Sequence, residues 1–506
     1  MVAEMSDLPL LSLLLLIPLA GIGLIWSVPR FKIARDAAVL TSVLTLGASL
    51  LVIARFNPAQ AGFQLEDSWP WIAALNIHFR LGVDGISLLF LPATTLLFAA
   101  VTISARPQMV RARLYFSLIL GLEAAVLGVF LAIDAMFFFL CWELTVVPIY
   151  FLVALWGVGA RRQQAATQYT LLMLAGGVPL LFGLLIPALS LPQLAFDLPT
   201  LLAQPLSRNT QFVVFLLLLL GFGVKAPLPP MHTWLPTLAL EGPVAVVALV
   251  AGIKLGLYGL IRFAIPMAPA AATDLHWLLA GIGVVAALYG ALAALAQTNL
   301  RVMLAYAGVS HVGLVLLGLA SFSQHGVQGA VLLTVSLALA TGGGLLAASF
   351  LQLRVGSCEL QNLGGVFVSM PRLAAFFLLC GLAGLGLPGT AGFPGEWLVL
   401  LATLQTHTGA GIAALAAMVF GGAYFMGLYR KAFFGPALRP AVATADDLLP
   451  REMWAVALIG GAILIFGLYP QPLLELTQSA VERWLQAVGA VGAVTSVGAV
   501  PPAPTF

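Results

Sequence analysis

The sequence predicts an all-α polytopic membrane protein with about fourteen transmembrane helices. Of its 506 residues, 61% are hydrophobic and only 8% are charged, and the mean hydropathy is +1.07. Soluble domains carry roughly a quarter charged residues, so this composition excludes a soluble globular protein. Apolar runs of about 20 residues recur along the chain, which is the length that a helix needs to cross about 30 Å of hydrocarbon.

The first apolar run is expected to be a retained span, because Glu4 and Asp7 precede it without any basic residue, unlike a signal peptide. The expected spans are 8–27, 36–54, 82–104, 114–132, 135–156, 168–191, 211–239, 243–266, 276–296, 302–321, 327–352, 373–403, 409–433 and 453–470. After residue 471 we expect a peripheral helix and then disorder, since the last residues include Pro501, Pro502 and Pro504.

The basic residues are divided unequally between the two sets of loops. The odd-numbered loops hold fifteen: Arg30, Lys32, Arg35, Arg106, Arg111, Arg113, Arg161, Arg162, Arg301, Arg354, Arg372, Arg430, Lys431, Arg439 and Arg451. The even-numbered loops hold five: Arg55, Arg80, Arg208, Arg262 and Arg483. Because positive residues favour the cytoplasmic side, both termini are expected to face the periplasm or a lumen.

Two other classes of function are excluded by the composition. A net charge of +3 is too small for nucleic-acid binding, which needs a dense basic surface. Cys141, Cys358 and Cys380 show no spacing of a disulfide framework, a metal site or an iron–sulfur site. Any electron-transfer centre is therefore expected on another chain.

Five ionisable residues fall inside the expected spans: Glu123, Glu143, Lys225, Lys254 and Glu396. A charge at mid-bilayer costs at least about 2.5–3.5 kcal/mol, so it usually performs a task in a polar interior. The alternative for each is a residue that reaches a helix end or belongs to a structural ion pair. Burial disfavours the charged form of both residue types, so such groups can exchange protons near neutral pH.

Two spans are interrupted by proline and glycine. The seventh reads FGVKAPLPPMHTWLP and the twelfth reads GLGLPGTAGFPGEWLVLL, and proline removes backbone donors and breaks a helix. Unwound backbone at membrane depth is tolerated only in a protein interior or beside water. Lys225 lies at the first break and Glu396 at the second.

Two broken helices five spans apart predict an inverted structural repeat, as in ion-coupled transporters. Residues 1–110 are expected to hold helices 1–3, residues 111–266 the first repeat, residues 267–434 the second repeat, and residues 435–506 the last span and a peripheral tail.

Several long motifs carry a family resemblance. GLEAAVLGVFLAIDAMFFFLCWELTVVPIYFLVALWG, VKAPLPPMHTWLP, QTNLRVMLAYAGVSHVG and LGLPGTAGFPGEW together resemble the antiporter-like membrane-arm subunits of complex I and NDH-1, most closely the M or D type (NuoM or NdhD). The resemblance runs from about residue 81 to about residue 470. It implies a proton-translocating subunit without a cofactor of its own, driven by quinone reduction elsewhere in a large complex.

The resemblance also implies roles for single residues. Glu143 is similar to the carboxylate of an ion pair, Lys225 to its lysine partner, Lys254 to a connecting lysine and Glu396 to a terminal carboxylate. Glu123 matches a second acidic position on the fourth span, and His311 a histidine usual in the proton path.

The chain departs from the family pattern in two places. Leu337 stands where a central histidine is usual, and Thr237, Leu238 and Ala239 follow HTWLP where the family continues with Asp and Ala-His. Leucine cannot carry a proton, so water would have to bridge Lys254 and Glu396. We expect Ser336, Thr341 and backbone freed by Gly342, Gly343 and Gly344 to support that water.

Three further polar residues have competing interpretations. His232, after the first break, is expected either at the mouth of a proton path or as a plain interfacial histidine. Asp134 fits an N-terminal helix cap better than a proton carrier. Arg301 is expected to anchor a loop.

Three functions remain open. The first is a pumping subunit of an NAD(P)H- or ferredoxin:quinone oxidoreductase, with iron–sulfur clusters and quinone on partner subunits. The second is an Mrp-type cation/proton antiporter subunit, and the third is a subunit of a specialised NDH-1, such as the photosynthetic CO2-uptake complex. The expected location is a bacterial inner membrane or a cyanobacterial thylakoid membrane.

Overall fold

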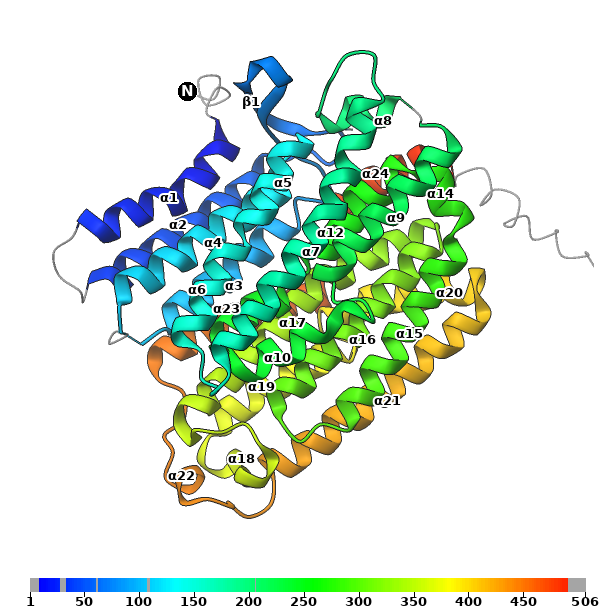
Figure 1. Cartoon of the computed structure of the whole chain (residues 1–506). Coiled ribbons are helices and arrows are strands. Elements are labelled where there is room, and N and C mark those ends of the chain that lie inside the picture. The colour runs from blue at the N-terminus through cyan, green and yellow to red at the C-terminus, as the bar shows by residue number, and fades with distance from the viewer. Residues whose placement is uncertain (1–8, 28–32, 61, 107–109, 205, 490–506) are drawn as a thin grey trace, which may run out of the picture.

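The computed structural model describes residues 9–27, 33–60, 62–106, 110–204 and 206–489, which form a bundle of long helices (Figure 1). Twelve helical segments in these ranges are long and apolar enough to cross a membrane. Ten are single helices: α1 Leu10–Ser27, α2 Ile33–Arg55, α4 Ala112–Leu131, α7 Arg162–Leu189, α9 Arg208–Lys225, α15 His276–Leu295, α16 Leu300–Ala320, α17 Gln324–Val355, α21 Thr408–Phe433 and α23 Pro450–Leu468. Two are composite: Ala135–Trp156, made of α5 Ala135–Leu144 and α6 Val146–Trp156, and Val244–Met267, made of α11 Val244–Gly252, α12 Leu255–Gly259, η3 Leu260–Ala264 and α13 Ile265–Met267.

The predicted helical membrane fold is confirmed, whereas the count of fourteen spans is not. α3 Phe90–Ser104 and α19 Pro371–Gly384 are apolar but have only 15 and 14 residues. The predicted span 373–403 is divided between α19 and α20 Gly392–Thr406. Each of the other twelve predicted spans overlaps a helical segment that is long and apolar enough to cross a membrane.

A two-stranded hairpin, absent from the prediction, precedes α3. β1 Gln64–Ile72 pairs antiparallel with β2 Ile77–Val83, and Trp69 lies opposite Phe79. The predicted start of the third span at residue 82 was wrong, because β2 continues to Val83 and helix α3 begins only at Phe90. The aromatic residues of this segment favour a pleated, half-buried strand.

Both predicted helix breaks are confirmed. α9 ends at Lys225, and the chain resumes as the short turn η2 Met231–Thr233 and helix α10 Trp234–Glu241. The second break separates α19 from α20. Two further interruptions were not predicted: Thr145 separates α5 from α6, and residues 253–254 separate α11 from α12.

Helix α17 forms the centre of the bundle. Every residue of its most apolar stretch is buried, and it packs against α11, α16, α19 and α20 (Figure 1). Small residues allow this close approach. At Gly329, for example, a Cβ atom would lie 2.9 Å from the backbone nitrogen of Val399 in α20.

Short elements cover the two ends of the bundle. The hairpin end carries β1, β2, α8 Leu198–Ala203, α14 Pro269–Asp274 and α24 Gln471–Val488, and the opposite, basic end carries η4 Leu360–Asn362, α18 Val366–Ser369 and α22 Pro440–Ala443 (Figure 1). Helix α24 confirms the predicted peripheral helix, and its Trp484 donates from Nε1 to the Ile261 carbonyl at 2.7 Å. The predicted disorder beyond it falls on residues 490–506, which lie outside the described ranges.

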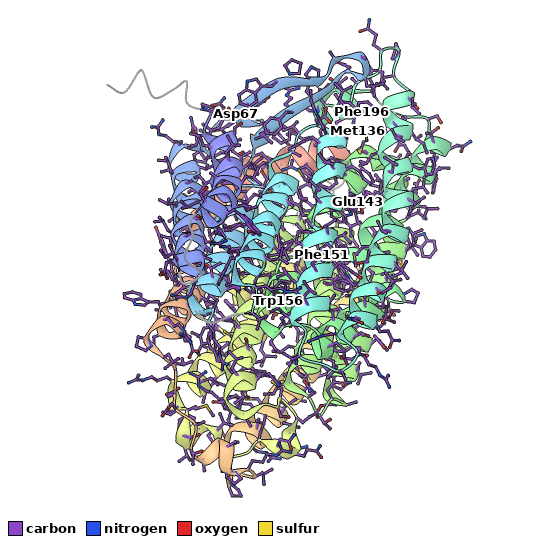
Figure 2. The ribbon with its side chains drawn as sticks, turned by 60° about the vertical axis from the view of Figure 1, so that its left-hand side comes forward. Asp67, Met136, Glu143, Phe151, Trp156 and Phe196 are labelled. Atoms are coloured by element: carbon purple, nitrogen blue, oxygen red, sulfur yellow. The ribbon has the colours of Figure 1, made fainter. Side chains whose placement is uncertain are left out.

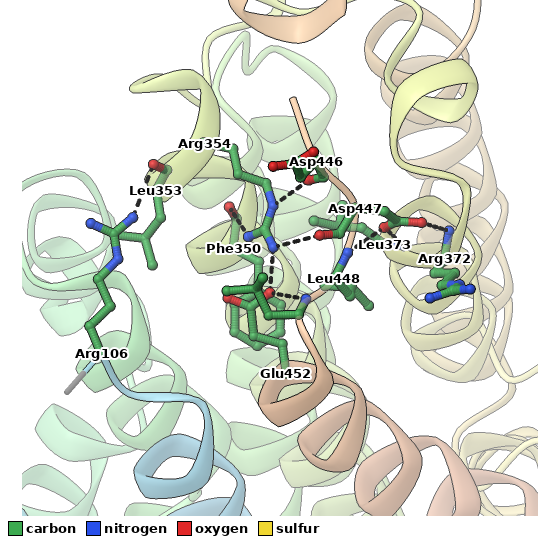
Figure 3. Close-up of polar contacts among 11 residues, drawn as sticks. Arg106, Phe350, Leu353, Arg354, Arg372, Leu373, Asp446, Asp447, Leu448 and Glu452 are labelled. Carbon is green, nitrogen blue, oxygen red and sulfur yellow. Dashed lines mark hydrogen bonds and ion pairs between the residues drawn. The ribbon is translucent and has the colours of Figure 1, made fainter. Parts of the chain in front are cut away.

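A polar cluster fastens α17 to α23 at the basic end (Figure 3). Arg354, in the last turn of α17, pairs with Glu452 in the first turn of α23. The same guanidinium donates to the carbonyl oxygens of Asp446 at 2.8 Å and Asp447 at 3.0 Å. The Asp447 carboxylate accepts from the backbone nitrogen of Arg372 at 2.8 Å, so α19 joins this cluster.

Candidate functional site

The first helix break presents the ammonium group of Lys225 to α5. Nζ of Lys225 donates to Thr145 Oγ1 at 2.7 Å and to the Trp142 carbonyl at 3.1 Å, and it lies 4.0 Å from the centre of the Trp142 ring. We call Trp142 and Thr145 the Lys225 cradle. The carbonyl is accessible because the helix is interrupted at Thr145, and the ring adds cation–π attraction.

Glu143 lies beside the cradle but does not meet Lys225. Both of its carboxylate oxygens are buried without a hydrogen-bond partner, and the side chain packs against Gly177 of α7. Figure 2 places Glu143 midway along α5 and α6, between Met136 and Trp156. Among the described residues, Glu143 and Lys225 are not within ion-pair distance, although they interact electrostatically.

A small cavity extends from Lys225 towards Lys254. Its volume is about 30 Å³, and its lining includes Lys225, Thr145, Tyr169 and Trp234 together with Ile253 and Leu255, which flank Lys254. One water molecule needs about 10–15 Å³ of such space. This Lys225 cavity is therefore large enough for one or two water molecules beside Lys225, and its lining reaches the two chain neighbours of Lys254.

Lys254 lies at the unpredicted interruption between α11 and α12. Its side chain is buried, and Nζ donates to the Ala251 carbonyl at 2.6 Å. Gly308 of α16 lies against this ammonium group, since a Cβ atom there would be 3.3 Å from Nζ. His311 is three residues further along α16, so the same helix face connects Lys254 with His311.

A second cavity, of about 20 Å³, lies beyond His311. Its lining includes His311, Thr341 and Tyr424. His311 is buried with Nδ1 unpartnered, and its ring lies against Gly384 at the end of α19. This His311 cavity can hold one water molecule.

Glu396 lies in the first turns of α20, immediately after the second break. It is buried, Oε2 has no hydrogen-bond partner, and the carboxylate packs against Gly386. Gly386 has φ +62°, a conformation that favours glycine, so the loop can fold closely over the carboxylate. Tyr424, which lines the His311 cavity, interacts electrostatically with Glu396.

Comparison with known proteins identifies the family of this chain. Residues 132–421 match the family described as NADH:quinone oxidoreductase/Mrp antiporter, TM. This chain is a member of that family.

Relatives cover nearly the full length of the chain. NADH-quinone oxidoreductase subunit M of Rhodobacter capsulatus is 32% identical and the match covers 94% of this chain and 96% of the relative. Subunit M of Escherichia coli strain K12 is 33% identical, with 94% and 98% covered. NAD(P)H-quinone oxidoreductase chain 4 1 of a Synechococcus strain is 34% identical, with 95% and 94% covered.

Solved structures agree with this assignment. A chain of respiratory complex I from Thermus thermophilus matches with a TM-score of 0.87 and 30% identity, covering 95% of this chain and 100% of that chain. A chain of the Mrp complex from Dietzia sp. matches with a TM-score of 0.81 and 20% identity, covering 95% and 99%. The second likeness shows a shared fold.

Glu123 lies outside the family match and away from the other candidates. It is fully buried in α4, Oε2 accepts from Ser42 of α2 at 3.2 Å, and Oε1 has no partner. Its neighbours Leu122 and Val126 line the Lys225 cavity. The structure thus turns Glu123 towards α2 and does not bring it to Lys225.

His232 is buried beside the second half of the bundle. It lies in η2, and Nε2 is 3.2 Å from the hydroxyl of Tyr289 in α15, while Nδ1 has no partner. Its ring also approaches Tyr306 of α16. The turn η2 thus packs His232 inwards against α15 and α16, and its place at the mouth of a proton path stays a prediction.

Leu337 occupies a different environment from the one expected. It is fully buried and lines neither of the two small cavities. The expectation that Gly342, Gly343 and Gly344 free their backbone was wrong, because α17 is unbroken. Ser336 donates to the Ala391 carbonyl at 2.6 Å and so supports the second break, whereas Thr341 lines the His311 cavity.

The expected structural roles of two residues are confirmed. Asp134 caps α5 by accepting from the backbone nitrogens of Met136 at 2.9 Å and Phe137 at 3.0 Å. Arg301 donates to the Gly242 carbonyl at 2.7 Å and ties α16 to the turn between α10 and α11.

Sequence reasoning missed a buried ion pair. Arg262, which was expected in a loop, is buried in η3 and pairs with Asp84, with Nη1 and Nη2 both donating to the carboxylate. The signal was an aspartate in the otherwise apolar segment LGVDGIS.

Proposed function

We propose that this chain is a proton-translocating antiporter-like subunit in the membrane arm of a quinone-reducing oxidoreductase of the complex I / NDH-1 type. The names of its relatives support this proposal. The observation that carries it is the series of ionisable groups at and between the helix breaks: Lys254, His311 and Glu396 are buried, and Glu143 and Lys225 are partly buried, with both carboxylate oxygens of Glu143 enclosed. Such groups are costly in a membrane and are kept for ion or proton movement.

The first proton-transfer step is assigned to Lys225. Next to Glu143, an ammonium group is stabilised by the opposite charge and holds its proton. In the cradle, the same group has only the neutral oxygens of Trp142 and Thr145 and the Trp142 ring. A shift of Lys225 from Glu143 to the cradle therefore favours release of its proton into the Lys225 cavity.

The later steps lead to Glu396. A proton that reaches Lys254 can pass along the face of α16 to His311, and water in the His311 cavity can bridge towards Tyr424 and Glu396. Glu396 then exchanges the proton at the second break. Glu123 and His232 are proposed as side positions of this path, because each has a buried unpartnered atom.

Redox chemistry is assigned to partner subunits. Cys141, Cys358 and Cys380 are separately buried in or beside α5, α17 and α19, and an iron–sulfur cluster needs about four cysteine ligands together. NAD(P)H or ferredoxin, iron–sulfur clusters and quinone are therefore expected on other chains of the complex.

The membrane is proposed to be a bacterial inner membrane or a thylakoid membrane, with both termini in the periplasm or lumen. The excess of basic residues in the odd-numbered loops supports this orientation. Burial of Arg262 removes one of the five residues counted for the other side and so increases the asymmetry.

The experiment uses vesicles that contain the complex assembled with this chain. The proposal expects proton translocation that requires electron flow to quinone and continues without Na⁺. Sodium-driven proton exchange in the absence of electron flow would contradict it and would indicate cation/proton antiport of the Mrp type.

A further inference from the structure

Polar grooves on the basic end lead towards the Lys225 cavity. A groove of about 380 Å³ between α7 and α10 is lined by Gln164, Gln168, Thr237 and Glu241, among others. An adjoining groove of about 570 Å³ along α7 shares Gln164 and Gln168 and reaches Thr233. Gln168 is six residues into α7, about 9 Å from its start. We call these two adjoining spaces the α7 groove: it is open to the outside, and its lining combines glutamine and threonine side chains, which can hydrogen-bond water entering from the basic end, with Leu171 and Leu172.

Two aromatic residues of the Lys225 cavity directly follow groove residues in the chain. Gln168 and Thr233 line the groove, and the residues that follow them, Tyr169 and Trp234, line the cavity. The two rings meet edge to face, with centroids 5.3 Å apart and an interplanar angle of 67°. Tyr169 and Trp234 are 1% and 2% exposed, so the pair is buried on the cavity side of the two residues that line the groove.

The two members of the pair are held differently. Trp234 donates from Nε1 to the Val224 carbonyl at 2.8 Å, which fixes its ring across the first helix break. The Tyr169 hydroxyl is buried without a hydrogen-bond partner. Buried tyrosine hydroxyls usually find a partner, and an unpartnered one indicates missing water or a function.

Other unpartnered atoms lie on the same helix. Thr170 Oγ1 is buried without a hydrogen-bond partner. Gly177, against which Glu143 packs, lies seven residues, or two helical turns, further along the same helix. Glu143 also acts electrostatically on Tyr169. The unpartnered hydroxyl of Tyr169 is thus part of the polar surroundings of both Glu143 and Lys225.

We propose that Tyr169 and Trp234 form a gate between the α7 groove and the Lys225 cavity, with Tyr169 as the moving member. The inference rests on the proposed function and names the side from which Lys225 is reprotonated. Rotation of the Tyr169 ring lets its hydroxyl accept a proton from water in the groove and donate its own proton to water in the cavity. One proton is transferred and the phenol is regenerated, so no oxidant or reductant is needed.

The chain supplies a matched control for the gate. Tyr115 and Trp156 also meet edge to face, with centroids 5.2 Å apart and an interplanar angle of 72°. Tyr115 is likewise buried, at 3% exposure. This pair lines a different cavity, between α3, α4, α6, α11 and α17, which contains neither Lys225 nor Glu143.

The test measures two quantities in vesicles that contain the assembled complex: passive proton flux down an imposed pH gradient, and proton pumping per electron pair during quinone reduction. Tyr169→Phe keeps the ring and is expected to lower pumping by about tenfold, less than the loss of a full acid–base group, without raising passive flux. Tyr169→Ala opens the gate and is expected to raise passive flux several-fold. Tyr115→Phe and Tyr115→Ala should change neither quantity.

Two results distinguish failure of the gate from failure of the function. If Lys225→Ala abolishes pumping while the Tyr169 variants behave like the Tyr115 variants, the gate is wrong and the proposed function stands. If Lys225→Ala pumps normally, the proposed function itself is wrong. A rise in passive flux for both Tyr169→Ala and Tyr115→Ala would show general loosening of the bundle and would also overturn the gate.

Discussion

Lys225 binds Thr145 and not Glu143. Its Nζ is 2.7 Å from Thr145 Oγ1, while both carboxylate oxygens of Glu143 remain buried and unpartnered. The acid and base that the motifs suggest as an ion pair are therefore separated in this structure. In the proposed mechanism, Lys225 moves between Thr145 and Glu143, and this movement opens and closes the ion pair.

We predict that Thr145 sets the balance between these positions. Thr145→Val keeps the shape but removes the hydroxyl, and a hydrogen bond to a charged group contributes about 1.5–3 kcal/mol. The variant should hold Lys225 at Glu143 and lower the pumping rate by about tenfold or more, with assembly preserved. Pumping during quinone reduction measures this, and Thr145→Ser is the control that should retain activity. Equal rates for the Val and Ser variants would show that the cradle has no role.

Glu396 is predicted to exchange protons at the second break. Glu396→Gln should impair pumping because the amide cannot titrate. Glu396→Asp should be partly tolerated, because it keeps a carboxylate under the loop at Gly386. Glu475→Gln, on the exposed face of α24, is the matched control. Wild-type pumping rates in both Glu396 variants would show that Glu396 has no role in proton exchange and is only a charged residue near a helix start.

Leu337 tests whether protons pass the centre of α17. Leu337→His adds a titratable group and is expected to raise proton leak or pumping, whereas Leu337→Phe overfills a packed position and should lower both. Passive and driven proton fluxes in the same vesicles measure the effect. Identical fluxes in the wild type and both variants would contradict this prediction and show that the path avoids Leu337.

The Asp84–Arg262 pair is predicted to support folding. Removing one partner leaves a buried charge uncompensated, which costs about 3–5 kcal/mol. Arg262→Met or Asp84→Asn should therefore reduce the amount of assembled complex in membranes, and the double variant should recover part of it. Normal assembly in both single variants, judged by native electrophoresis, would show that the pair is dispensable.

The sequence predicted the parts of the fold that depend on composition and proline. Apolar length located the helices, and the prolines after Lys225 and before Glu396 located both breaks. The interruption at Lys254 was not predictable in this way, because ALVAGIKLGLYGL contains no proline; there the Lys254 ammonium group donates to the Ala251 carbonyl. The hairpin escaped prediction because its strands lie between strongly apolar spans and β2 runs into the predicted third span.

The candidate site was also predictable only in part. Charges in apolar runs identified Glu143, Lys225, Lys254 and Glu396 without any coordinates. Their partners were not predictable, because the Lys225 cradle uses a backbone carbonyl, a hydroxyl and a ring that no charge pattern indicates. Tyr169 carries no charge, so the charge pattern could not identify it. Its unpartnered hydroxyl and its ring contact with Trp234 are apparent only in the structure.

The measurement that tests the central claim most directly is the number of protons translocated per electron pair in complexes that carry Glu143→Gln or Lys225→Ala. If these two residues form the working pair, both variants should assemble and proton translocation through this subunit should be abolished. The control Lys431→Ala, at the basic end of α21 and far along the chain from the breaks, should translocate as the wild type does. Normal proton translocation in either the Glu143 or the Lys225 variant would contradict the account.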